Sequence, residues 1–97
     1  MKTYELEFHA LALKEWHKLD GSINTQFVKA LSKRLLSPHI SSARLRGHLQ
    51  NIYKIKLRDV GYRLVYEMVD QCLVVIVIAI GRRDHGDTYQ IAIQRNK

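Results

Sequence analysis

The sequence predicts a small α+β domain in which a mainly antiparallel, twisted sheet packs against a hairpin of two N-terminal helices. Polar and apolar residues alternate on both sides of Gly61, which is typical of a β-hairpin. Apolar residues recur every four positions over 23–35, which indicates an amphipathic helix. Residues 73–80 are all apolar and mostly β-branched, as expected for a strand covered on both faces. The expected order is β-α-α-β-β-β-α, in one domain over residues 1–97.

The N-terminal part is expected to form one strand and the helical hairpin. Residues 4–8 alternate and indicate the strand, and residues 10–19 carry apolar side chains at helical spacing. Ser22 is expected to cap the second helix, because its hydroxyl can accept from a free backbone N–H. Ser37 precedes Pro38 and should end that helix, since the helical conformation is disfavoured before proline.

The hairpin around Gly61 is expected to have one apolar face and one basic face. Its strands are expected at about 52–58 and 62–69. A two-residue loop at Val60–Gly61 would place Arg58 opposite Arg63 on the basic face. Because opposed like charges destabilise a sheet, such an arrangement indicates a surface shaped for an anionic ligand.

A last short helix is expected from Thr88 to about Arg95. Asp87 is followed three residues later by Gln90, a spacing that resembles a capping box at the start of a helix. Tyr89 lies at the start of this helix, and Ile91 and Ile93 are available for packing.

The charge of the chain is unevenly distributed. Sixteen Lys and Arg against nine Asp and Glu give a net charge of +7. Residues 44–83 hold eight of these bases and three of the acids, so the excess lies mainly on the predicted sheet. Such an excess points to nucleic acid, an anionic membrane surface or an acidic protein as the partner.

Several classes of function are disfavoured by composition. The longest apolar run, 72–80, is far shorter than the about 20 residues that span a bilayer. Cys72 is the single cysteine, so no internal disulfide can form. The histidines show no paired ligand spacing, and no glycine-rich phosphate loop is present. We therefore expect a cytoplasmic protein without metal, cofactor or membrane contact.

The chemistry-bearing residues that remain are four cations and a tyrosine: Lys54, Lys56, Arg63, Arg83 and Tyr89. One interpretation is a site for an RNA phosphate. The other is a solvated basic sheet edge, where lysines discourage aggregation. The residues alone leave both interpretations open.

Three motifs resemble the RelE family of bacterial toxins: Tyr53-Lys-Ile-Lys-Leu-Arg, Gly61-Tyr-Arg-Leu-Val-Tyr, and Gly81-Arg-Arg followed by Tyr89. Leu11-Ala-Leu-Lys-Glu-Trp and Leu45-Arg-Gly match the family too, so the likeness covers nearly the whole chain. It implies a ribosome-dependent endonuclease that cuts mRNA in the ribosomal A site. The implied partners are the 70S ribosome, mRNA and a RelB-type antitoxin, with operator DNA bound only through the antitoxin complex.

The resemblance also implies roles for individual residues. The family's active-site lysines fall on Lys54 and Lys56, its arginines on Arg63 and Arg83, and its tyrosine on Tyr89. Contacts to RNA or the ribosome are implied for four further residues: Arg46, Arg58, Arg82 and His85. Two of these depart from the family pattern, because Arg82 replaces a common lysine and His85 a frequent arginine.

The mechanism implied by the resemblance is attack of the RNA 2′-hydroxyl on the adjacent phosphate, with Tyr89 as general base. Lys54 and Arg63 would hold the phosphate. Arg83 would stabilise the leaving group and act as its acid, with His85 as the rival acid. Two alternatives are a gyrase-inhibiting toxin of the ParE type on the same scaffold, and a non-catalytic RNA-binding or ribosome-binding protein.

Overall fold

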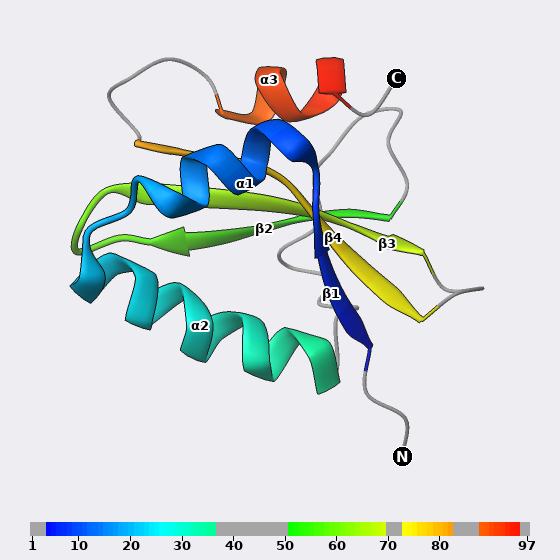
Figure 1. Ribbon diagram of the computed structural model, residues 1–97, viewed down its shortest axis with the longest axis horizontal. Helices are drawn as coiled ribbons and strands as arrows, with labels where there is room; N and C mark the ends of the chain where they lie inside the picture. The colour runs from blue at the N-terminus through cyan, green and yellow to red at the C-terminus, as the bar shows by residue number, and fades with distance from the viewer. Residues whose placement is uncertain (1–3, 37–50, 70–72, 83–87, 96–97) are drawn as a thin grey trace.

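The computed structural model describes residues 4–36, 51–69, 73–82 and 88–95. Their elements follow the predicted order β-α-α-β-β-β-α (Figure 1). They are β1 (Glu5–Phe8), α1 (Ala10–His17), α2 (Gly21–Leu36), β2 (Ile52–Leu57), β3 (Tyr62–Val69), β4 (Val74–Arg82) and α3 (Thr88–Arg95). The predicted fold class is therefore confirmed.

The four strands form one mixed sheet in the order β1-β4-β3-β2. β1 runs parallel to β4, whereas the β2–β3 and β3–β4 pairs are antiparallel. β4 lies inside the sheet, and α2 and α3 lie on opposite sides of it (Figure 1). This position confirms the prediction of a strand covered on both faces, although the strand runs over Val74–Arg82 instead of residues 73–80.

Two apolar clusters cover the two faces of the sheet. The larger cluster joins α1 and α2 to the sheet and includes Phe27, Leu31 and Tyr66. Trp16 also packs there, with its ring centroid 5.1 Å from that of Phe8. The smaller cluster lies beneath α3 and consists of Ile52, Val65, Ile78, Ala79 and Ala92, with Tyr89 packed against it.

The hairpin register differs from the prediction by two residues. Leu57 pairs with Tyr62, so the loop has four residues, Arg58–Gly61, instead of two. Gly61 has φ of 71° and its N–H donates to the Leu57 carbonyl at 2.9 Å, a left-handed turn that glycine adopts at little cost. A shift of two residues keeps every side chain on its predicted face. The basic pair is nevertheless Lys56 opposite Arg63, and the prediction of Arg58 opposite Arg63 is wrong.

The helix starts also correct the sequence analysis. α2 begins at Gly21, so Ser22 lies inside the helix and its prediction as the cap is wrong. The Asp20 carbonyl accepts from the Asn24 N–H at 2.9 Å, and the Ser22 hydroxyl donates to the Asp20 carboxylate. α1 ends at His17 and is capped by His9, whose Nδ1 accepts from the Leu11 N–H.

α3 has the predicted limits, Thr88 and Arg95. The capping-box residue Asp87, the expected helix end at Ser37–Pro38 and the cysteine Cys72 lie outside the described residues.

β4 carries a β-bulge where it passes beneath α3. Tyr66 pairs with Val77 and Val65 pairs with Ala79, which leaves Ile78 as the extra residue of β4. Ile78 and its neighbour Ala79 both pack in the cluster under α3. A bulge re-aims side chains and increases the local twist, so this one supplies the surface on which α3 rests.

α3 begins in direct contact with Gly81 of β4. A Cβ on Gly81 would lie 2.7 Å from Oγ1 of Thr88, and Thr88 is 3 % exposed. We expect Gly81→Ala to lower the free energy of unfolding by about 1–3 kcal/mol, because the start of α3 must move to admit the methyl group. Chemical denaturation followed by Trp16 fluorescence measures the change.

Gly21→Ala is the matched control, because a Cβ at Gly21 meets no heavy atom within 4 Å. The double variant Gly81→Ala/Thr88→Ala should recover part of the lost stability, since it removes the clashing oxygen. Equal stability of the Gly81→Ala and Gly21→Ala variants would contradict the close approach.

Candidate active site

Tyr89 lies against two cations that come from different strands. The guanidinium carbon of Arg63, on β3, is 5.0 Å from the centroid of the Tyr89 ring. The ammonium nitrogen of Lys54, on β2, is 5.7 Å from the same centroid. Both distances are in the range of cation–π contacts. The structure thus brings together three residues that lie far apart in the sequence.

The sheet sets the orientation of these cations. Side chains alternate along a strand, so Lys54 and Lys56 lie on the same face of β2 as Ile52, which packs beneath α3. Arg63 lies directly opposite Lys56 on β3 and joins them on this face. We call Lys54, Lys56, Arg58 and Arg63 the cationic cluster.

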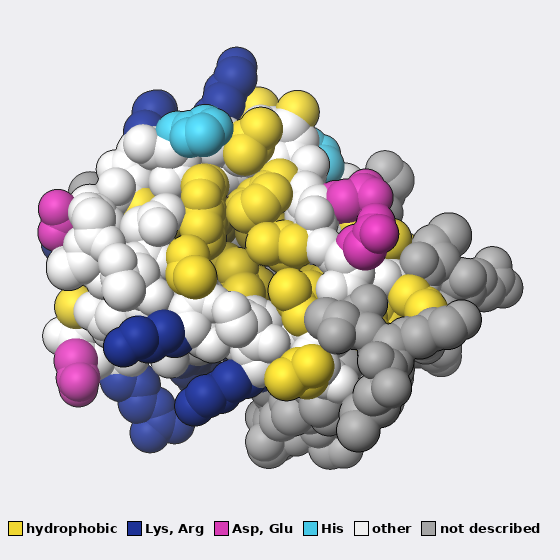
Figure 2. Space-filling view, turned by 60° about the horizontal axis from the view of Figure 1, so that its bottom comes forward, with side chains coloured by type: hydrophobic (Ala, Val, Ile, Leu, Met, Phe, Trp, Pro, Cys, Tyr) yellow, Lys and Arg dark blue, Asp and Glu magenta, His cyan; other side chains and the backbone are white. Residues whose placement is uncertain are grey.

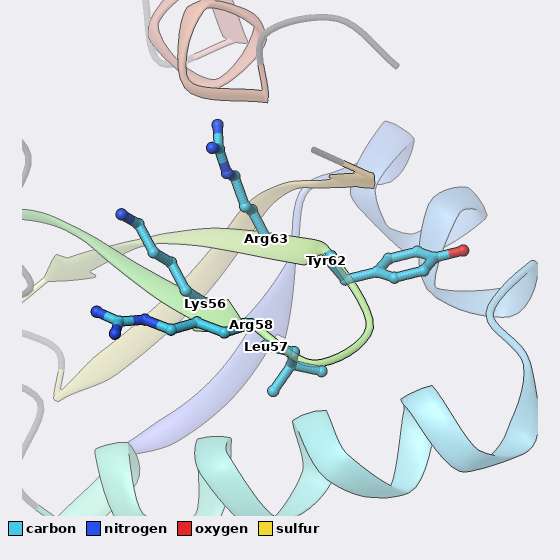
Figure 3. A pocket seen from close by; sticks show the side chains of 6 residues that line it. Lys56, Leu57, Arg58, Tyr62 and Arg63 are labelled. Carbon is cyan, nitrogen blue, oxygen red and sulfur yellow. The ribbon is translucent and has the colours of Figure 1, made fainter. Parts of the chain in front are cut away.

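The far end of the cationic cluster borders a shallow cavity of about 190 Å³. Figure 3 shows Lys56 and Arg58 extending from the hairpin to one side and Arg63 pointing toward α3, while Tyr62 points away from all three. Arg58 belongs to the loop instead of the strand, yet it still lies beside Lys56. A small anion could contact several of these cations at once.

Mutual repulsion changes the proton affinity of the cationic cluster. The ammonium of Lys54, then desolvation, then the guanidinium groups of Arg63 and Arg58 lower the pKa of Lys56 from its usual value. Lys56 is exposed, so solvent screens these effects. The direction still indicates that, among the described residues, positive charge predominates around Lys56.

The hydroxyl oxygen of Tyr89 is buried, while the rest of the residue is partly exposed. Ile52, Val65, Ile78, Ala79 and Ala92 form the apolar floor against which the ring packs. The ring is therefore fixed between an apolar surface and the two cations. Access of a substrate to the hydroxyl requires a displacement of side chains or of α3.

Arg34 supports this site from the other face of the sheet and was missed by the sequence analysis. Its guanidinium donates to the Lys54 carbonyl at 3.3 Å and to the Tyr66 hydroxyl at 2.9 Å. Burial raises the pKa of Tyr66, and the ring of Tyr66 stacks on that of Tyr53 at 5.6 Å. The available signal was the position of Arg34, three residues after Leu31 on the apolar side of α2.

Of the other predicted site residues, the structure describes only Arg82. Arg82 is exposed at the end of β4, where it pairs with Tyr62 in the sheet register. Arg46, Arg83 and His85 lie outside the described residues, so their roles stay predictions.

In the described part of the chain, no group of three or more His, Cys, Asp or Glu side chains is placed to hold a metal ion. None of the helices described has the length and apolarity needed to cross a membrane.

The class of protein follows from comparison of this fold and site with known proteins. Residues 6–85 match the family model of the ParE toxin of the type II toxin–antitoxin system parDE. A RelE-like toxin protein of Escherichia coli is 49% identical over 92 residues, covering 95% of this chain and 96% of the relative. The mRNA interferase toxin RelE of E. coli K12 is 46% identical over 93 residues, covering 96% and 97%.

Solved structures agree with this class. The crystal structure of isolated E. coli RelE superposes with a TM-score of 0.81 at 44% identity, covering 97% of this chain and 99% of that chain. The toxin in the intact E. coli RelBE toxin–antitoxin complex gives 0.79 at 48% identity, covering 81% and 95%. The chain belongs to the RelE family of type II toxins, within the RelE/ParE superfamily.

The repulsion in the cationic cluster can be tested by titration. We expect Lys54→Gln to raise the pKa of Lys56 toward its usual value, because the Lys54 charge is the largest cause of the lowering. NMR titration of the lysine side-chain resonances measures the pKa. Lys29→Gln, on the helix at the other face of the sheet, serves as the control. An unchanged or lower Lys56 pKa in Lys54→Gln would contradict the assigned cause.

Proposed function

We propose that this chain is a ribosome-dependent endoribonuclease that cleaves mRNA in the A site of the 70S ribosome and thereby inhibits translation. The observation that carries the proposal is the contact of the Tyr89 ring with Arg63 and Lys54, at 5.0 and 5.7 Å. In this contact, a tyrosine that could accept a proton lies beside two cations that could bind a phosphate. The relatives named mRNA interferase, at 46% identity, support the same activity.

The proposed reaction uses the 2′-hydroxyl of the RNA as nucleophile. Tyr89, acting as its phenolate, takes the proton from this hydroxyl and becomes the neutral phenol, and the 2′-oxygen attacks the adjacent phosphorus. The bond from phosphorus to the 5′-oxygen breaks, and that oxygen takes up a proton. The products are a 2′,3′-cyclic phosphate and a free 5′-hydroxyl, so no oxidant or reductant is required.

The cations would stabilise the charge that develops on the phosphate. Lys54 and Arg63 would hold the scissile phosphate, with Lys56 beside them, since fixed charges aimed at the transition state require little reorganisation. Arg83 would stabilise the leaving oxygen. Arg83 and His85 are the two candidates for donating a proton to it. The buried Tyr89 hydroxyl would have to be uncovered when mRNA binds.

Dependence on the ribosome has a physical basis. A few cations on one sheet face can bind phosphates, but in-line attack also needs the 2′-oxygen, phosphorus and leaving oxygen to be aligned. A codon held in the A site would supply this alignment. The net charge of +7 would favour docking on ribosomal RNA with a strong dependence on salt. We assign the supporting contacts to Arg46, Arg58, Arg82 and His85.

A RelB-type antitoxin is the proposed protein partner, and operator DNA would be bound only through the complex with it. Relatives of this chain have been solved with RelB. Figure 2 shows hydrophobic side chains gathered on the side where α2 lies, with Lys and Arg, His, and Asp and Glu side chains around them. Such an apolar surface is typical of a protein interface and suits an amphipathic antitoxin segment. We expect the antitoxin to cover the cationic cluster or to displace α3, in the cytoplasm.

The base assignment can be tested with Tyr89→Phe on ribosomes programmed with a defined mRNA. We expect the cleavage rate to fall by about 10²–10⁴-fold, the usual contribution of a positioned general base. Tyr53→Phe is the matched control, because Tyr53 lies on the opposite face of the sheet and should leave cleavage unchanged. Cleavage by Tyr89→Phe at the wild-type rate would refute the assignment.

The second candidate is a gyrase-inhibiting toxin, because the family model that matches this chain is named for the ParE toxin. A supercoiling assay run beside the mapping of mRNA ends separates the two classes. We expect mRNA cut within codons and unchanged gyrase activity. Inhibited supercoiling with intact mRNA would overturn the proposed nuclease in favour of the second candidate.

A further inference from the structure

An ion pair joins the two helices that border the end of β4. Arg95, the last residue of α3, binds Glu15 of α1 through its two terminal guanidinium nitrogens, at 2.9 Å and 3.0 Å. The Arg95 side chain is 15% exposed and that of Glu15 is 30% exposed. Exposed ion pairs add little stability, but a paired, partly buried fork is geometrically specific.

The same two side chains also bind the backbone of β4. The Ile80 N–H donates to Oε1 of Glu15 at 3.0 Å, and Arg95 donates to the Ile78 carbonyl at 2.9 Å. β1 pairs with β4 only as far as Val77, whose carbonyl accepts from the His9 N–H. The parallel pairing with β1 ends at the bulge of β4. Beyond that point, Glu15 and Arg95 bind the backbone of β4 in place of β1.

α3 depends on packing against the rest of the molecule. It has eight residues, and a helix this short is not stable in isolation. Its buried residues are Thr88 and Ala92, both small. These two and Arg95 follow each other at spacings of four and three, which places them on one side of the helix. Thr88 seats the first turn on Gly81, and Arg95 fixes the last turn.

We propose that Glu15 and Arg95 are a positioning pair that holds α3, and with it the Tyr89 ring, in register with Lys54 and Arg63. This inference rests on the proposed function, because it assumes that Tyr89 acts on the substrate. In the part of the chain that the structure describes, no hydrogen bond or ion pair links Glu15 or Arg95 to Lys54 or Arg63. Their effect reaches Tyr89 through the position of α3, which Figure 1 shows beside α1.

The test uses Arg95→Met and Glu15→Gln in the full chain, followed by amide hydrogen exchange. We expect α3 amides to exchange about tenfold faster or more, because a charged hydrogen-bond partner is lost. Amides of β2 and β3 should change little. Arg95→Lys keeps the positive charge but cannot form the two parallel hydrogen bonds to Glu15. It should therefore recover part of the protection of the α3 amides from exchange. Gln94→Met, at an exposed position of the same helix, is the control.

Cleavage on programmed ribosomes then separates positioning from general stability. A misplaced base lowers kcat more than it changes KM, and we expect about a tenfold loss in kcat with Arg95→Met. Unchanged exchange in α3 would overturn the proposal, and so would faster exchange with an unchanged kcat. If the wild-type chain cleaves no mRNA, the proposed function fails, and the exchange measurement alone decides whether the pair holds α3.

Discussion

β4 is the strand on which the rest of the structure depends, because it is covered on both faces and carries the bulge at Ile78. Its regular part pairs with β1 and β3 and forms the floor of the larger core. At the bulge, Ile78 and Ala79 both pack under α3. Gly81 then allows Thr88 to approach the backbone closely. One irregularity in a buried strand thus decides where the helix that carries Tyr89 can lie.

The cationic cluster destabilises the sheet, because its like charges repel one another. Lys56 faces Arg63 across the hairpin, and the charge of Lys54 first, then desolvation, then the charges of Arg63 and Arg58 lower the pKa of Lys56. A sheet tolerates such a pair only if other contacts hold it together. Here, Arg34 binds the Lys54 carbonyl from the opposite face, and the stacked rings of Tyr53 and Tyr66 lie beneath. The polar face can therefore remain charged and available for an anion because the apolar face is well packed.

The sequence predicted the order of elements, the limits of α3 and the face on which Lys54, Lys56 and Arg63 lie, because alternation and helical spacing are local signals. The alternation of polar and apolar residues determines on which face of a hairpin each side chain lies, but not which residues pair across it. The predicted pairing of Arg58 with Arg63 was therefore wrong by two residues. Arg34 and the Glu15–Arg95 pair were missed because their partners are distant in sequence. Arg46, Arg83 and His85 stay predictions.

The central claim is that Tyr89 and the cations act as one site, and a double-mutant cycle between Tyr89 and Arg63 tests it most directly. The cleavage rates of Arg63→Gln, Tyr89→Phe and the double variant are measured on programmed ribosomes. Residues that act as a unit give non-additive losses, so the double variant should be little slower than the slower single variant. Losses that multiply would show that the two residues act independently and would contradict the account.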